Sequence, residues 1–196
     1  MTRSVSVLAL VCIVMMMVVA PQAWAQEEAA SGDSESLGSF SLAPKFGYAW
    51  FGASTGYSTT GILDHHAFNL QLNLDFGGQS AFELAPYYTY HAVGSDIHTV
   101  GVLLGYAYRW STLGGKLYPS IGFGVKLGYM VSDGIDYGLE IIGRIPVGIT
   151  YYVLEDLGIV AEFGIGSATL AYTGYGNDFG ASIGLYIDFL VGIRWP

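Results

Sequence analysis

One stretch of the chain brings together histidine, serine and aspartate, the residue types that acid–base and nucleophilic chemistry uses. Ser95 and Asp96 lie between the last two of the four histidines, which are His65, His66, His91 and His98. A serine nucleophile needs a base within hydrogen-bond distance and a third group that orients that base. No local motif arranges such a set, so the sequence favours a non-enzymatic protein with no catalytic residue and no cofactor. No two histidines spaced two residues apart face one side of a strand, so no zinc site is predicted either.

Aspartate is the only one of the four charged residue types Asp, Glu, Lys and Arg in the longer polar segments of the chain. These segments contain no Lys or Arg, and their aspartates are Asp64, Asp96, Asp133, Asp136 and Asp178. Carboxylate oxygens suit divalent cations, and divalent cations at these loops are a candidate partner. A complete calcium loop would need more ligands at fixed spacing, so a solvated acidic rim is favoured and no metal site is assigned. The same segments offer no basic residue to bind lipopolysaccharide phosphates.

Another set of charged residues occupies alternate positions within apolar segments, opposite the large apolar side chains. Its members are Lys45, Asp75, Glu83, Arg109, Lys126, Glu140, Arg144, Glu162 and Asp188. Because an unpaired buried charge is costly, we expect these side chains to pair with one another. Regular hairpins would place Asp75 and Glu83 near Arg109, and closure between the first and last strands would place Lys45 opposite Asp188. They would also place Lys126 and Arg144 at one level, with Glu140 just above. A structural plug is the favoured interpretation, and a gate that passes ions is the alternative.

The apolar residues recur at every second position in eight segments, which predicts eight β-strands. The segments span residues 39–50, 68–76, 82–91, 100–110, 120–129, 139–151, 159–166 and 183–195. Tight turns are predicted at 77–80, 111–116 and 154–158, and longer loops at 52–66, 92–98, 131–138 and 170–178. An even number of strands with short turns at one end and longer loops at the other is typical of bacterial membrane barrels. Bulges or local irregularity are expected at three prolines, Pro44, Pro86 and Pro146, because proline removes a ladder hydrogen bond.

The predicted fold is therefore all-β, an eight-stranded antiparallel transmembrane up-and-down β-barrel. Eight strands enclose a lumen only just wide enough for side chains to fill it. The apolar face carries far too many large residues for that volume, whereas the opposite face is mostly Gly, Ala, Ser and Thr with scattered charges. The apolar face must therefore point outward, where it would contact lipid.

The N-terminal segment has the features of a secretory signal peptide. Arg3 precedes an apolar stretch from Val5 to Ala20, and Ala23-Trp24-Ala25 forms a small-x-small cleavage site. We expect a cleaved signal at 1–25, a disordered acidic periplasmic leader at 26–38 and the barrel at 39–196. The only cysteine, Cys12, lies in the signal, so the mature chain would have no thiol. The formal net charge of −9 becomes more negative without Arg3, and such acidity excludes nucleic acid as a partner.

In the last segment, every odd position from Ile183 to Trp195 is apolar. The whole pattern resembles the small eight-stranded outer-membrane barrels of the OmpA, OmpX and OmpW type. The stretch from Gly184 to Trp195, with Tyr186 and Phe189, resembles the C-terminal signal that the barrel-assembly machinery reads, although Pro196 departs from the usual aromatic ending. The resemblance implies an integral protein of the bacterial outer membrane with both termini periplasmic. Its partners would be outer-membrane lipids and the barrel-assembly machinery.

Three functional hypotheses follow from this organisation. The first is a non-enzymatic outer-membrane barrel with an envelope-structural or surface-interaction role, acidic extracellular loops and a lumen plugged by charge pairs. The second is a porin-like function, either a small cation-favouring pore or a conduit for small hydrophobic molecules. The third, which is less favoured, is a lipid-modifying enzyme at the outer rim that uses His91 or His98.

Overall fold

A computed structural model describes residues 40–55, 65–93, 95–132, 135–174 and 179–196 of the chain. The chain separates into two compact units, residues 1–35 and 36–196, and every described residue belongs to the second. The predicted signal peptide and acidic leader lie outside the described residues. Within those residues, no helix is long and apolar enough to cross a membrane.

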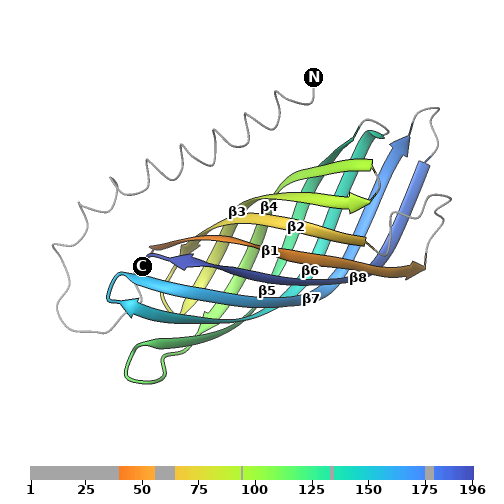
Figure 1. Ribbon diagram of the computed structural model, residues 1–196. Coiled ribbons are helices and arrows are strands. Elements are labelled where there is room, and N and C mark those ends of the chain that lie inside the picture. The colour runs from red at the N-terminus through yellow and green to blue at the C-terminus, as the bar shows by residue number, and fades with distance from the viewer. Residues whose placement is uncertain (1–39, 56–64, 94, 133–134, 175–178) are drawn as a thin grey trace. The chain divides into compact units, whose positions relative to one another are not determined.

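The eight described strands form one closed antiparallel barrel, in which each strand pairs with its neighbours in the chain and the first pairs with the last. The strands are β1 (Phe40–Thr55), β2 (His65–Phe76), β3 (Ser80–Val93), β4 (Ser95–Arg109), β5 (Leu117–Ser132), β6 (Ile135–Leu154), β7 (Leu157–Gly174) and β8 (Phe179–Arg194). Figure 1 shows β1 and β8 side by side, where they close the barrel. The predicted fold class and all eight predicted strands are confirmed.

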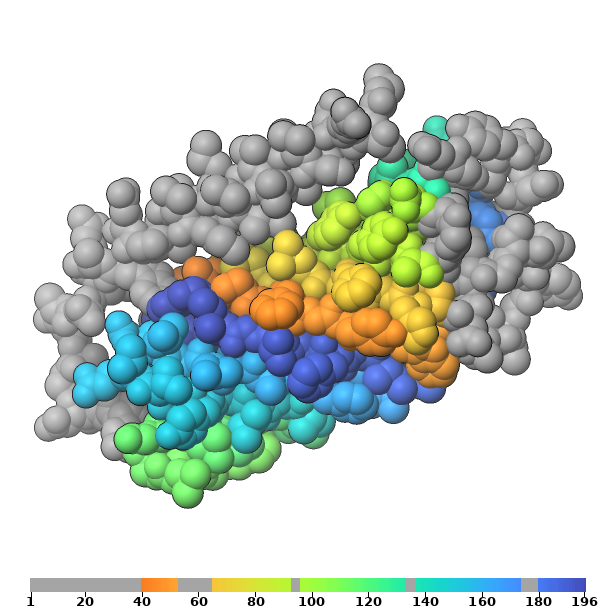
Figure 2. Space-filling view, viewed as in Figure 1, coloured from red at the N-terminus to blue at the C-terminus, as the bar shows by residue number. Residues whose placement is uncertain are grey.

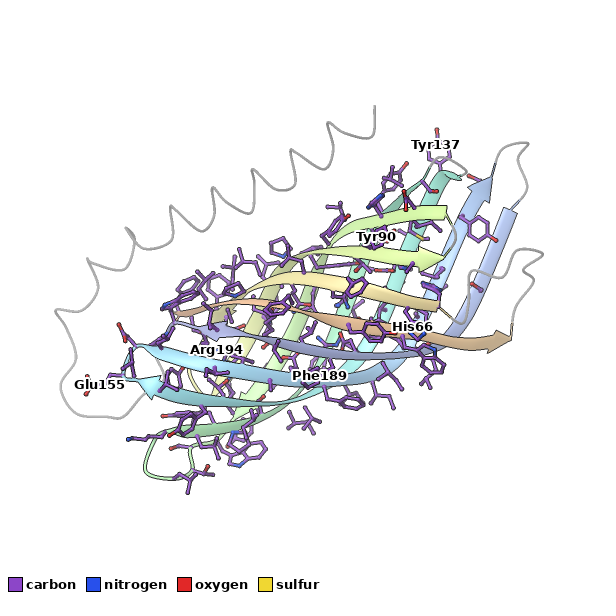
Figure 3. All side chains as sticks on the ribbon, in the orientation of Figure 1. His66, Tyr90, Tyr137, Glu155, Phe189 and Arg194 are labelled. Atoms are coloured by element: carbon purple, nitrogen blue, oxygen red, sulfur yellow. The ribbon has the colours of Figure 1, made fainter. Side chains whose placement is uncertain are left out.

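The two ends of the barrel differ in how their strands are connected. One end, here called the turn end, holds the turns after β2, β4 and β6 together with the C-terminus (Figure 1). Positive φ angles occur in two of these turns, at Gly77 and at Leu113 to Gly115. The other end, here called the loop end, is where β1, β3, β5 and β7 end and the next strands begin. In Figure 3, Glu155 marks the turn end and Tyr137 marks the loop end.

The strands extend further at the loop end than the sequence predicts. The predicted loop at 92–98 is wrong for most of its length, because β3 continues to Val93 and β4 starts at Ser95. The strands likewise enter most of 131–138 and the first part of 170–178. Backbone pairing continues past the apolar part of each strand, because polar and glycine residues can still form ladder hydrogen bonds. Apolar alternation alone therefore underestimates strand length.

Three of the four prolines in the described strands, namely Pro44, Pro86 and Pro146, interrupt pairing without shifting its register. Pro44 pairs with Leu72 of β2, while its ladder to β8 is interrupted and resumes in the same register. Pro86 and Pro146 likewise each interrupt one of their two ladders. The local irregularity predicted at these positions is therefore present as interrupted pairing rather than as bulges, and the register shifts occur elsewhere, for example between Phe51 and Ser54. Each proline removes one backbone N–H donor. In each case the ladder to one neighbouring strand is interrupted, and the ladder to the other neighbour continues.

Side chains alternate between the lumen and the outside along most of each described strand. Outward residues such as Phe46 and Phe123, each 62% exposed, are large and apolar. Figure 2 shows that the side chains of β1 and β8 form an unbroken surface where these strands meet. A water-soluble protein rarely exposes a contiguous apolar patch above a few hundred Å². The sequence predicts that the large apolar side chains point outward because the lumen is too small to hold them, and the structure places them on the outside.

Candidate functional site

The lumen contains every buried Lys, Arg, Asp and Glu of the described residues. There are five side chains of each sign: Lys45, Arg109, Lys126, Arg144 and Arg194, and Asp75, Glu83, Glu140, Glu162 and Asp188. The formal charge of the lumen is therefore zero. All nine charges that the sequence assigns to the lumen lie there, and Arg194 joins them.

A turn-end cluster is built around Asp75. The Arg109 guanidinium lies 2.8 Å from Asp75 Oδ2 and 3.0 Å from Glu83 Oε1, as regular hairpins suggest. Arg194 Nη2 lies 2.7 Å from the same Asp75 oxygen, and the Ser41 hydroxyl donates to it at 3.1 Å. Sequence reasoning left Arg194 out of this network. Its position on the same face of the last strand as Asp188 was the available signal.

A central cluster surrounds Arg144 and crosses the lumen. Arg144 Nη2 lies 2.7 Å from Glu162 Oε1 and 2.8 Å from Asp188 Oδ1. Lys45 Nζ lies 2.6 Å from Glu162 Oε2, and Lys126 Nζ lies 3.6 Å from Asp188 Oδ2. Opposite charges thus occupy both sides of each carboxylate, an arrangement that offsets the cost of removing them from water.

The structure does not place Lys45 opposite Asp188. The β1–β8 register pairs Lys45 with Gly192 and Ala49 with Asp188, so Lys45 and Asp188 are offset by four residues along the seam. Closing a barrel requires strands to tilt and to stagger, and this stagger cannot be read from local alternation. Lys45 therefore contacts Glu162 of β7 instead.

Tyr186 of β8 lies at the centre of this network and is fully buried. Its hydroxyl donates to Asp188 Oδ2 at 2.8 Å and accepts from Lys126 Nζ at 3.1 Å. Asn69 Nδ2 also donates to it, at 3.0 Å. The sequence places Tyr186 in the C-terminal assembly signal but gives it no role in the lumen.

Glycines make room for these side chains. A Cβ added at Gly164 would lie 2.5 Å from Arg144 Nη2 and 2.6 Å from Arg144 Nε, and would also meet Asp188. At Gly101, a Cβ would lie 2.6 Å from the Tyr87 ring. Inward glycines therefore correlate with long polar side chains on neighbouring strands, a signal that sequence analysis could have used.

A second polar chain runs toward the loop end. Tyr87 donates to Glu140 Oε1 at 3.0 Å, and Glu140 Oε2 lies 3.2 Å from His91 Nε2. His91 Nδ1 lies 2.8 Å from His65 Nε2, and His91 Nε2 lies 2.9 Å from the Thr99 hydroxyl. Glu140 thus contacts Tyr87 and His91, rather than forming an ion pair with Lys126 or Arg144.

An apolar cluster fills the lumen beside these histidines. It includes Phe51, whose ring stacks nearly parallel on the His65 ring, with 4.7 Å between the ring centroids. Its other members are Ala49, Ala67, Ile97, Met130, Ile142, Ala168, Leu170 and Tyr186. Paired charges and a packed apolar layer therefore both occupy the lumen of the described barrel.

The histidines do not converge on one site. His65 and His91 are buried in the lumen, whereas His66 and His98 lie on the outer face. Among the described residues, no group of three or more His, Cys, Asp and Glu side chains could hold a metal ion. The side chains of Ser95, Asp133 and Asp136 lie outside the described part.

The C-terminal strand keeps its alternation in the structure. Tyr186 points into the lumen, whereas Phe189 is 51% exposed on the outer face (Figure 3). Gly184 pairs with Ala168 of β7, and Trp195 exchanges two backbone hydrogen bonds of 2.9 Å with Leu42. The last residues thus complete the closure between β8 and β1.

Comparison with solved structures identifies the architecture. The crystal structure of Neisserial surface protein A matches with a TM-score of 0.57 and 13% identity, covering 84% of this chain and 99% of that one. The fold is that of the small eight-stranded outer-membrane barrels. The outer membrane protein OprG from Pseudomonas aeruginosa matches at a TM-score of 0.54 and 13% identity, covering 83% of this chain and 98% of that one. No protein-family model matches the chain, and no curated protein matches it in sequence.

Proposed function

We propose that this protein is an integral bacterial outer-membrane barrel with a non-enzymatic, envelope-structural or surface-interaction role, and that its lumen is closed to ions. The turn end and both termini would face the periplasm, and the loop end would face the exterior. Outer-membrane lipids and the barrel-assembly machinery would be its partners.

Membrane integration is supported by the outer surface. Outward residues from Ile121 to Tyr129 on β5 are all large and apolar, and each is at least 41% exposed. The same pattern recurs on β6, from Ile145 to Tyr151. A closed barrel satisfies its backbone hydrogen bonds internally, which is required of a strand protein in lipid.

The observation that carries the closed lumen is the pairing of its charges. Arg144 is buried between Glu162 and Asp188, at 2.7 and 2.8 Å, and its side chain is 1% exposed. Separating a buried ion pair costs several kcal/mol, about 3–5 kcal/mol when one partner is removed. Passage of an ion would require such a separation, and the apolar layer around Phe51 adds a second barrier.

Planar-bilayer recording tests this proposal. Protein purified from membranes in mild detergent, and shown to be folded by its unboiled gel mobility, should insert without producing discrete current steps. The Glu83→Gln and Arg144→Gln variants should be recorded in parallel. Cation-selective steps in the unmodified protein that change in these variants would establish the porin-like alternative and overturn the closed lumen.

A separate measurement addresses catalysis at the rim. Mass spectrometry of membrane lipids from cells with and without the protein should show the same lipid species. A new or lost acyl group that requires His91 or His98 would overturn the non-enzymatic assignment. Increased detergent sensitivity in cells that lack the protein would favour the envelope-structural role over surface interaction.

A further inference from the structure

A patch of polar and aromatic side chains lies on the outer face of β2, β3 and β4 near the loop end. It is here called the border patch and consists of His66, Tyr88, Tyr90, Ala92, Asp96 and His98. The β2–β3 and β3–β4 ladders place His66, Ala92 and Asp96 in one row across the three strands. Figure 3 shows His66 and Tyr90 in the half of the barrel that lies toward the loop end.

Two tyrosines orient the polar groups of β4. The Tyr88 hydroxyl lies 2.6 Å from His98 Nδ1, and the Tyr90 hydroxyl donates to Asp96 Oδ1 at 2.9 Å. The His98 ring also contacts both tyrosine rings, with centroids at 5.9 and 5.4 Å. These contacts fix the orientation of His98 and Asp96 before any ligand binds.

The remaining atoms of His98 and Asp96 have complementary hydrogen-bonding character. When Tyr88 donates to Nδ1, the proton of neutral His98 is on Nε2, which then becomes a donor. Asp96 is exposed and uses Oδ1 for Tyr90, so Oδ2 remains as a charged acceptor. A hydroxyl or amide group can bond to either side of such a pair, because it both donates and accepts.

Ala92 gives the row a small centre between two larger polar residues. Neighbouring strands lie about 4.8 Å apart, so the backbones of His66 and Asp96 are separated by about 9–10 Å. The exposed methyl group of Ala92 is the only side chain between them in the row. The next row toward the membrane contains the rings of Phe68, Tyr90 and His98. The span above Ala92 is therefore wide enough for one sugar ring, with aromatic rings beside it.

The position along β4 places the border patch at the edge of the membrane. Outward residues from Val100 to Trp110 are all apolar or aromatic, and no charged residue interrupts them. Ten residue steps of about 3.3 Å, along a strand tilted by about 40°, correspond to a height of about 25 Å, which is the height of the apolar band of outer-membrane barrels. His98 therefore lies just beyond the border of the band, and Asp96 lies one outward position further.

We propose that the border patch binds the N-acylated amino-sugar headgroup of lipopolysaccharide, the glycolipid of the exterior leaflet. Asp96 accepts a hydrogen bond from a sugar hydroxyl or from the amide N–H, and His98 Nε2 donates to a sugar oxygen. The sugar ring lies above Ala92, where its C–H groups pack against the neighbouring aromatic rings. This inference rests on the proposed outer-membrane location, with the loop end outside, and adds a lipid ligand to it.

Charge directs the contact to the sugar rather than to the phosphates of the same lipid. Asp96 would repel a phosphate group, and the predicted loop segments contain no Lys or Arg to offset that repulsion. A hydroxyl or amide group carries no charge, so it can approach the carboxylate without that cost. The border patch therefore recognises the uncharged part of the headgroup.

Lipid binding to the detergent-solubilised protein, followed by native mass spectrometry, tests the proposal. The probes are lipid A from which the phosphates have been removed, intact lipid A, and phosphatidylglycerol as an anionic lipid without an amino sugar. We expect Asp96→Asn and His98→Ala each to weaken binding of the dephosphorylated lipid A about 3- to 10-fold, the range of one exposed charge-assisted hydrogen bond. Binding of phosphatidylglycerol should not change, and the phosphates of intact lipid A should not strengthen its binding.

A steric variant tests the position of the sugar without removing any polar group. Ala92→Leu fills the span between His66 and Asp96 and should weaken dephosphorylated lipid A by at least as much as Asp96→Asn. Ala161→Leu adds the same side chain to the outer face of β7 nearer the turn end, and Glu155→Gln removes an exposed carboxylate from the β6–β7 turn. Both control variants should bind like the unmodified protein, and unboiled gel mobility shows that every variant is folded.

Three results would overturn the proposal. The first is unchanged binding of dephosphorylated lipid A in Asp96→Asn or in Ala92→Leu. The second is binding that requires both the phosphates and added Mg²⁺, because the contact would then pass through a cation rather than the sugar. The third is failure of the folded protein to insert into vesicles, which would overturn the membrane location itself.

Discussion

Arg194 on β8 reaches across β1 to Asp75 on β2, with Nη2 2.7 Å from Oδ2. Lys45 on β1 makes the reciprocal contact, because its Nζ reaches across β8 to Glu162 on β7 at 2.6 Å. Two ion pairs thus span the seam between the first and last strands, one in each direction. The seam forms only when the whole chain is in place, so these pairs link closure of the barrel to the charges in its lumen.

Replacing Arg194 tests the first of these pairs. Arg194→Gln should destabilise the barrel by about 1–3 kcal/mol, the usual effect of losing a hydrogen bond to a charged group, while Asp75 keeps Arg109 as a partner. The folded band on unboiled gels should convert at a lower temperature. Lys116→Gln removes an exposed positive charge from a turn at the same end and should leave that temperature unchanged. Identical conversion temperatures for Arg194→Gln and the unmodified protein would contradict a role in closure.

Replacing Lys45 should have a larger effect that a second substitution relieves. Lys45→Met leaves Glu162 buried with only Arg144 as a counter-ion, and breaking a buried pair costs about 3–5 kcal/mol. The double variant Lys45→Met with Glu162→Gln should recover part of that loss, because the uncompensated carboxylate is removed. Urea unfolding of the barrel in lipid vesicles measures both. Additive effects of the two substitutions would show that Lys45 and Glu162 are not coupled.

Gly164 and Gly143 make a matched pair of glycines on neighbouring strands. Gly164→Ala should displace Arg144 and Asp188, since the added methyl would lie 2.5 Å from Arg144 Nη2. Gly143→Ala should be tolerated, because nothing lies within 4 Å of its added Cβ. Overpacking of this kind costs about 1–3 kcal/mol, measured by the same unfolding assay. Equal stability of the two variants would mean that the central cluster shifts freely.

Tyr87 tests the polar chain toward the loop end. Tyr87→Phe removes the donor to Glu140 and should destabilise the barrel by about 1–3 kcal/mol, since the carboxylate stays buried. Tyr106→Phe removes a hydroxyl from the exposed outer face and should change stability by less than about 0.5 kcal/mol. Nuclear magnetic resonance should detect a change in the chemical shifts of the His91 ring protons in Tyr87→Phe but not in Tyr106→Phe. An unchanged His91 signal would contradict the chain from Tyr87 through Glu140.

Local alternation was sufficient to predict all eight strands and the inward direction of the charges. Asp75 and Glu83 meet as predicted because the β2–β3 turn is tight, so hairpin register follows from turn length. Arg109 joins them through the pairing of β4 with β3. The same reasoning misplaced Lys45 relative to Asp188. That pair spans the seam, whose stagger depends on all eight strands together rather than on any single turn.

The contributions of Tyr87, Tyr186 and the buried histidines could not be read from alternation. Tyrosine is common on both faces of the strands, so its inward position identifies no partner. His65 and His91 lie 26 positions apart in the chain, and only the β2–β3 register brings His65 Nε2 to 2.8 Å from His91 Nδ1. Inward glycines such as Gly101 and Gly164 are the features that mark where long polar side chains cross.

The balance of five positive and five negative side chains in the lumen also determines how the barrel responds to an electric field. Voltage does work on each charge that moves along the field, about 2.3 kcal/mol for each elementary charge moved through 100 mV. A fixed set of ion pairs with no net charge gives a field nothing to displace. As long as the ion pairs of the described barrel stay together, its lumen charges supply no gating charge, whereas an unpaired charge in a lumen of the same size could move with the field.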